Sequence, residues 1–144
     1  MDKYPQLKLE NQICFPIYAC AKEITKAYKP FLDELDLTYT QYITMMVIWE
    51  HKELKVKEVG KYLYLDSNTL TPLLKRLEEK GYVTRRRSAE DERDLIVTIT
   101  KQGEALKKKA SSVPGKLVSC IDLEPQKAQA LYALLYELLE KLMT

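Results

Sequence analysis

Three cysteines and one histidine are the residues of this sequence with the most distinctive chemistry. Cys14 and Cys20 lie together in QICFPIYACAKE near the start of the chain, and Cys120 lies in KLVSCIDLEP. There is no CxxC pair and His51 is the only histidine, so we expect no metal site and no cofactor. An odd number of cysteines without framework spacing predicts free thiols in a reducing compartment.

Cys14 is the thiol whose position favours a reaction. Proline is tolerated in a first helical turn, so Pro16 predicts a helix that begins near Cys14 or Phe15, with the thiol beside unpaired amides. Such a position favours the thiolate, which is the form that peroxides oxidise. The alternative is that Cys14 is a small buried apolar residue, as free cysteines often are.

Cys20 cannot be the disulfide partner of Cys14 on one helix. Six helical residues separate the two Cα atoms by about 9 Å of rise and roughly 120° of rotation. A disulfide spans Cα atoms no more than about 7 Å apart.

The elements that must position these thiols are mostly helical. Apolar residues spaced by three or four predict a helix over residues 13–35, in which Pro30 could cause a kink. Thr38 and Gln41 have the spacing of a capping box, and the almost wholly apolar helix that follows belongs at the centre of a domain.

In the rest of the chain, the spacing of apolar residues is typical first of helices, then of strands and then of helices again. VKEVGKYLYL predicts a short helix, and DSNTLTPLLKRLEEKG predicts a second one that Gly81 ends. YVTRRRS and LIVTIT alternate like the strands of a hairpin with a charged tip. Two helices, over 101–120 and 125–143, close the chain, so the fold class is mainly α with a small β-hairpin.

A short helix, a turn, a polar-faced helix and a basic hairpin form the outline of a winged helix-turn-helix, whose second helix enters the DNA major groove. Six cations and two carboxylates between residues 67 and 87 give +4, which exceeds the chain's whole net charge of +2. A solvated charge run is the alternative. The expected DNA contacts are Ser67, Asn68, Thr69, Thr71, Pro72, Lys75 and Arg76 on the helix, and Arg85, Arg86, Arg87, Asp91 and Arg93 on the hairpin.

The segment from LYLDSNTL to KQGEAL resembles the winged helix of the MarR family of bacterial repressors. Asp91-Glu92-Arg93 matches its wing pattern D-x-R, and residues 100–103 match its T-x-x-G. The resemblance implies one MarR-type domain over 1–144, with a winged helix-turn-helix lobe at 36–103 and dimerisation helices at 10–35 and 104–144. It also implies a homodimer whose wings straddle double-stranded operator DNA.

The final helix supports a dimer independently, because one small domain can hardly cover its wide apolar stripe. The stripe consists of Leu131, Tyr132, Leu134, Leu135, Tyr136, Leu138, Leu139 and Leu142.

Within that family, the N-terminal region resembles the organic-hydroperoxide-sensing repressors of the OhrR group. Cys14 occupies the place of their sensing cysteine in the context N-Q-x-C-F, although Pro16 departs from the pattern. Tyr28 and Tyr39 match tyrosines that hold the thiolate from the opposite subunit, and Tyr18 resembles a further tyrosine near the thiol. Cys120 lies where some members carry a resolving cysteine, and others use a small thiol instead; Cys20 is expected to pack.

The expected function is therefore a DNA-binding transcriptional regulator, a repressor that releases its operator when an organic hydroperoxide or related oxidant oxidises Cys14. The alternative is a MarR-type regulator released by a small aromatic or phenolic ligand near Tyr28, Tyr39 and Trp49. Enzyme activity as a thiol peroxidase is not expected. The N-terminus has no signal-peptide pattern and no apolar run could span a bilayer, so we expect a cytoplasmic protein without membrane contact.

Overall fold

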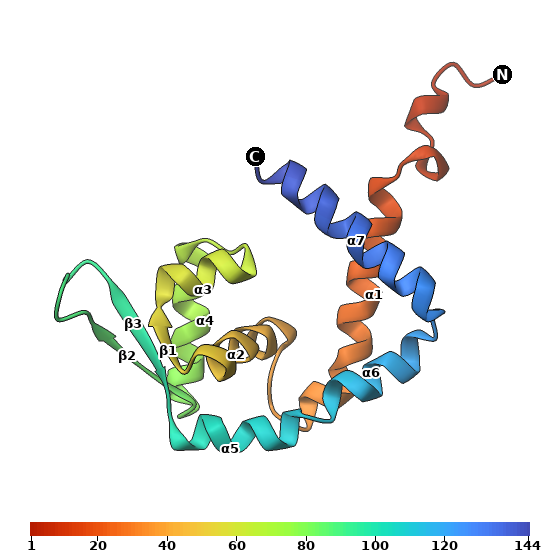
Figure 1. The fold of residues 1–144 in the computed structure, drawn as a ribbon. Helices are drawn as coiled ribbons and strands as arrows, with labels where there is room; N and C mark the ends of the chain where they lie inside the picture. The colour runs from red at the N-terminus through yellow and green to blue at the C-terminus, as the bar shows by residue number, and fades with distance from the viewer. The chain divides into compact units, whose positions relative to one another are not determined.

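The computed structural model describes all residues, 1–144, as two compact units, 1–113 and 114–144, and each is described by itself. The first unit begins with two 3-10 turns, η1 (Pro5–Leu7) and η2 (Leu9–Asn11). Its helices are α1 (Cys14–Asp33), α2 (Tyr39–His51), α3 (Val56–Leu63), α4 (Ser67–Glu79) and α5 (Lys101–Ala110), and its strands are β1 (Glu53–Lys55), β2 (Val83–Arg87) and β3 (Leu95–Ile99) (Figure 1). Helix α6 (Val113–Ile121) leads into the second unit, which ends with α7 (Pro125–Leu142). None of these helices combines the length and apolar character needed to cross a membrane.

Helix α2 is the centre of the core, as its apolar sequence predicts. The capping box at its start is confirmed, because the Gln41 amide donates to Thr38 Oγ1 at 3.2 Å and the Thr38 amide donates to Gln41 Oε1 at 3.1 Å. Met45 and Ile48 have no exposed surface. Burial of one such side chain stabilises the fold by about 1.5–3 kcal/mol.

Helices α3 and α4 form the predicted helix-turn-helix. The turn follows Tyr64, whose left-handed backbone (φ 57°) ends α3. Asp66 caps α4, and its carboxylate accepts from the Thr69 amide at 2.8 Å. After α4, Gly81 adopts a φ of 86°, the conformation that glycine favours at a helix stop. The four leucines predicted to face the core, Leu70, Leu73, Leu74 and Leu77, are all buried.

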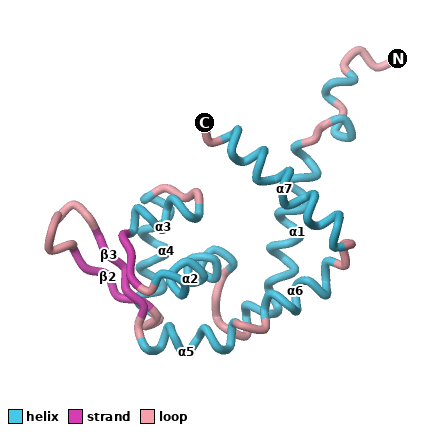
Figure 2. The backbone as a smooth tube through the Cα atoms, in the orientation of Figure 1, coloured by secondary structure: helices cyan, strands magenta, loops and turns pink.

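The predicted hairpin is confirmed, and a third strand joins it. The antiparallel sheet has the order β1-β3-β2, with Leu54 and Arg85 flanking Val97 in the register (Figure 2). β1 contains only three residues, so it shows no alternation that would reveal it; its pairing with β3 defines it.

The prediction of a single helix over residues 101–120 is wrong. α5 ends at Ala110 and α6 begins at Val113. Pro114 explains the break, since proline cannot donate to the carbonyl of Ala110 and its ring clashes there. Leu106, Ala110 and Val113 belong to the core of the first unit, so this core extends beyond residue 103, the expected limit of the lobe.

Candidate DNA interface and redox site

Helix α4 presents one polar face to solvent. Its buried leucines recur every three or four residues, which leaves the intervening positions outside. All seven residues expected on the recognition surface are exposed: Ser67, Asn68, Thr69, Thr71, Pro72, Lys75 and Arg76. Thr71 Oγ1 donates to the Ser67 carbonyl at 2.8 Å, so that hydroxyl already has one partner in the helix.

The wing tip is arranged around Arg93. Its guanidinium binds Asp91 through two hydrogen bonds of 3.1 Å, and the side chain is 90% exposed. These hydrogen bonds from Arg93 hold the pKa of Asp91 below its usual value. A bidentate carboxylate fixes the orientation of a guanidinium. Arg87 lies nearby and donates to the Glu92 carbonyl at 3.0 Å.

Arg85 does not share this open arrangement, although the sequence groups it with Arg86 and Arg87, which are exposed. Glu78 of α4 accepts from both the Arg85 amide, at 3.0 Å, and the Arg85 guanidinium, at 3.2 Å. The Arg85 side chain is only 20% exposed, and its Nε is buried without a hydrogen-bond partner. Arg86 pairs with Glu53 of β1 at 3.1 Å. Arg85 therefore connects β2 to α4 through its interactions with Glu78.

A further ionic cluster, which sequence reasoning missed, lies where the wing loop meets the start of β3. The half-buried Asp94 accepts from Lys55 at 3.2 Å and from Lys57 at 3.4 Å. The hydrogen bond from Lys55 is the main reason that the pKa of Asp94 is lowered. Asp94 is far from Lys55 and Lys57 in the sequence, so only the pairing of β1 with β3 could reveal the cluster.

Cys14 is the first residue of α1, as the position of Pro16 predicts, and it is exposed. No side chain caps this end of the helix, so the thiol lies beside first-turn amides without an intrahelical partner. Cys20, which was expected to pack, is also exposed in this chain. It lies six residues further along the same continuous helix, which agrees with the geometry that excludes a disulfide between Cys14 and Cys20. Cys120 is exposed near the end of α6.

Tyr28 and Tyr39 come together within one chain. Their ring centroids are 4.9 Å apart, and Tyr42, which the sequence did not single out, lies 5.7 Å from Tyr28. Burial, with smaller contributions from Tyr39 and Tyr42, raises the pKa of Tyr28 to about 12. We call Tyr28, Tyr39 and Tyr42 the tyrosine cluster.

Tyr18 lies apart from this cluster. It is exposed on α1, four residues after Cys14, and residues at this spacing share one face of a helix. Tyr28 is ten residues further along, or about 15 Å of helical rise. Cys14 is therefore distant from Tyr28 along α1, which runs unbroken through Pro30.

Large apolar side chains remain uncovered in both units. On α1 they are Phe15, Ile17, Tyr18 and Ile24, and just before it Ile13. In the second unit, α7 has no buried residue, and most of its predicted stripe is exposed: Leu131, Tyr132, Leu134, Leu135, Tyr136, Leu138 and Leu142. Contiguous exposed apolar surfaces of this kind usually mark sites of contact with another protein.

Together, α3, α4 and the three-stranded sheet define a winged helix-turn-helix protein. Residues 26–110 match the family model of the transcriptional regulators SarA/Rot. The organic hydroperoxide resistance transcriptional regulator of Bacillus subtilis strain 168 is 48% identical over 141 residues, which cover 98% of this chain and 96% of that protein. The chain belongs to the MarR family of winged helix-turn-helix transcriptional regulators, in the group of this hydroperoxide resistance regulator.

Solved structures agree with this assignment. Reduced AbfR bound to DNA aligns with a TM-score of 0.78 and 34% identity, over 99% of this chain and 100% of that one. AbfR, from Staphylococcus epidermidis, has also been solved overoxidised on DNA and in a disulfide-formed state. An Escherichia coli MarR mutant bound to operator DNA has the same fold, with a TM-score of 0.79 at 23% identity over 96% of this chain and 99% of that one.

Proposed function

We propose that this protein is a dimeric DNA-binding repressor that releases its operator when an organic hydroperoxide or related oxidant oxidises Cys14. The observation that carries the proposal is the exposed Cys14 thiol at the uncapped start of α1, in a chain whose α4 face and wing tip stay open. The likeness to a hydroperoxide resistance regulator and to AbfR in its reduced, overoxidised and disulfide states supports it.

The first step is a two-electron oxidation of sulfur. The Cys14 thiolate attacks one peroxide oxygen, the O–O bond breaks, and the leaving alkoxide takes a proton to become an alcohol. Cys14 is thereby converted to a sulfenic acid. The protein acts as a sensor in this scheme, since each chain reacts without turnover.

The tyrosine cluster responds to this oxidation, because it contains the hydroxyls that contact the thiolate in the reduced protein. With its pKa near 12, the Tyr28 hydroxyl stays protonated at neutral pH and can donate a hydrogen bond. A thiolate accepts such bonds strongly. We place Tyr28 and Tyr39 against Cys14 of a second copy, because 14 helical residues, about 21 Å, separate Cys14 from Tyr28 in its own chain.

A second thiol completes the response. Attack by Cys120 of the other copy on the sulfenic sulfur forms a disulfide and releases water; a small thiol would give a mixed disulfide by the same chemistry. Exposure of Cys120 leaves it accessible for either role. A tenfold loss of operator affinity needs a change of only about 1.4 kcal/mol.

The test compares two exposed cysteines of α1. DNA selected for binding from a random library serves as operator, and its dissociation constant is measured by fluorescence anisotropy before and after cumene hydroperoxide. Wild type and Cys20→Ser should release the DNA, whereas Cys14→Ser should bind it and keep it. Release by the oxidised Cys14→Ser protein overturns the sensor role.

The same samples decide the second thiol. Non-reducing electrophoresis of the oxidised protein should show a dimer band that Cys120→Ser abolishes. A dimer band that persists in Cys120→Ser removes Cys120 from the mechanism.

A further inference from the structure

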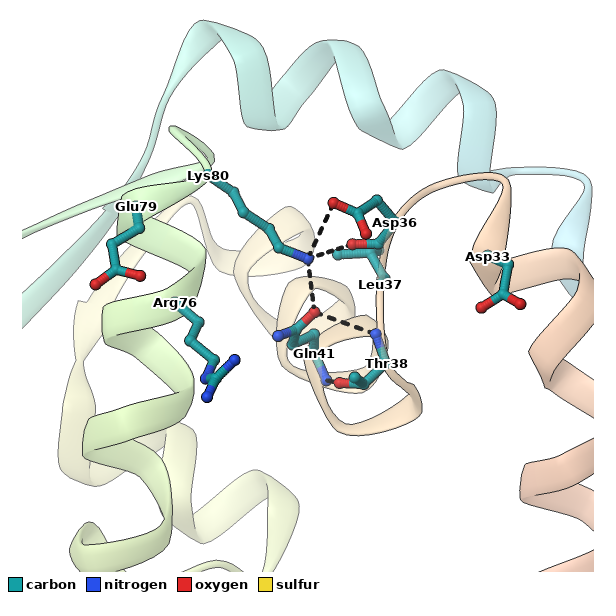
Figure 3. A pocket seen from close by; sticks show the side chains of 8 residues that line it. All are labelled: Asp33, Asp36, Leu37, Thr38, Gln41, Arg76, Glu79 and Lys80. Atoms are coloured by element: carbon teal, nitrogen blue, oxygen red, sulfur yellow. Dashed lines mark hydrogen bonds and ion pairs between the residues drawn. The ribbon is translucent and has the colours of Figure 1, made fainter.

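The C-terminal end of recognition helix α4 is tied to the turn between α1 and α2 by one lysine. Lys80 follows the last residue of α4, and its ammonium donates to the Asp36 carbonyl and to Gln41 Oε1, the latter at 3.1 Å (Figure 3). The Asp36 carboxylate lies 3.6 Å away. Lys80 reaches these partners across a pocket of about 440 Å³, into which Arg76 also points.

The α2 side of this connection is held firmly. Gln41 is 4% exposed, and its Oε1 also accepts from the Thr38 amide, so it closes the capping box and binds Lys80 with one atom. Asp36 has a left-handed backbone (φ 53°), which turns its carbonyl into the junction. A shift of the first turn of α2 therefore changes the acceptors that hold Lys80.

That first turn also carries part of the tyrosine cluster. Gln41 lies between Tyr39 and Tyr42 in the sequence, and both rings contact Tyr28 of α1. Tyr39, which is proposed to contact the sensing thiol, and Gln41, which accepts from Lys80, thus belong to one turn of α2, and Tyr28 of α1 packs against that turn.

The other side of the junction leads to the DNA surface. Glu78, two residues before Lys80, holds β2 through Arg85. The C-terminal end of α4, the recognition helix, therefore contacts the turn at Asp36 through Lys80 and strand β2 of the wing through Glu78 and Arg85.

We propose that Lys80 is a positioning residue that couples the tyrosine cluster to α4, so that operator affinity follows the state of Cys14. This rests on the proposed redox function. Coupling of this kind typically changes affinity about 5- to 150-fold. A role limited to stability would lower the folded fraction equally in the reduced and oxidised protein and would leave their affinity ratio unchanged.

The decisive quantity is the ratio of operator dissociation constants after and before oxidation of Cys14. Lys80→Met keeps the aliphatic stem and removes the ammonium. We expect a ratio above about tenfold in wild type and below about threefold in Lys80→Met, while Lys80→Arg retains most of the response. Mass spectrometry should show equal oxidation of Cys14 in all three proteins. Lys107→Met, an exposed lysine of α5, is the matched control and should respond like wild type.

Each outcome is informative. A full affinity loss in oxidised Lys80→Met overturns the coupling role. If wild type itself keeps its operator affinity although Cys14 is oxidised, the proposed function fails instead. Gln41→Met is the second variant should Lys80→Met not fold, because it removes the α2 acceptor and keeps the lysine. A wild-type ratio in Gln41→Met also counts against the proposal.

Discussion

Ile48 in α2 and Ile17 in α1 are the same side chain on two regular helices, yet Ile48 has no exposed surface and Ile17 is 37% exposed. The boundary between these environments runs through α1 itself. Near its end, Leu32 is buried in the core with α2, whereas its first turns bury nothing. The core of the winged-helix lobe forms within one chain, whereas the thiol-bearing part of α1 leaves its large apolar side chains exposed.

The basic residues of the wing divide in the same way. Arg85 is enclosed and bound to Glu78, while Arg93 is held by Asp91 and points into solvent. The enclosed Arg85 has its ionic partner inside the lobe and helps to fix the position of β2. The exposed Arg93 is accessible to another molecule.

The largest expected effect is on core packing. Ile48→Ala should reduce the free energy of unfolding by about 2–5 kcal/mol, because it leaves a cavity at the centre of α2. Urea unfolding followed by tryptophan fluorescence measures the loss. The matched Ile17→Ala should mainly weaken self-association in sedimentation, and an equal loss of lobe stability from both changes would remove the distinction between the two regions.

The wing gives a prediction of intermediate size. Arg93→Ala should weaken operator binding and reduce the slope of log affinity against log salt by about one, as expected for loss of one phosphate contact. Arg85→Ala should weaken binding through the geometry of β2 and leave that slope unchanged. Dissociation constants over a salt series check both, and identical slope changes would contradict the division between Arg85 and Arg93.

The smallest effect concerns Tyr28 and alkaline pH. The pKa of Tyr28 is about 12 in the folded protein and 10.0 for a free tyrosine, so the unfolded chain loses this proton first. Ionisation of Tyr28 therefore does not change the free energy of unfolding below pH 10. It lowers that free energy as the pH rises from 10 towards 12. Tyr28→Phe should make that fall shallower in urea unfolding series, and an unchanged pH dependence would show that burial does not perturb the phenol.

Local patterns were sufficient to predict much of the fold. Thr38 and Gln41 formed the expected capping box, the leucines of α4 are buried as their spacing predicts, and Gly81 ends the helix. These features depend on residues within about one helical turn of one another, so the sequence displays them directly.

Features that depend on distant partners could not be predicted. The three residues of β1 form a strand only because β3 pairs with them, and Arg85 turns inward because Glu78 accepts it. The break after Ala110 was visible in the sequence as Pro114, and apolar periodicity alone concealed it. The roles of Cys14, Cys120 and the tyrosine cluster towards a second copy stay predictions.

Trp49 has a practical consequence for all of these experiments. It is the only tryptophan of the chain, it is buried in α2, and its indole N–H donates to the Gly103 carbonyl at the start of α5 at 2.9 Å. Its emission is therefore a built-in optical signal from the seam between α2 and α5, recorded without a label. An oxidised state that only repositions intact lobes should leave this emission unchanged, whereas one that loosens the lobe should shift it to the red.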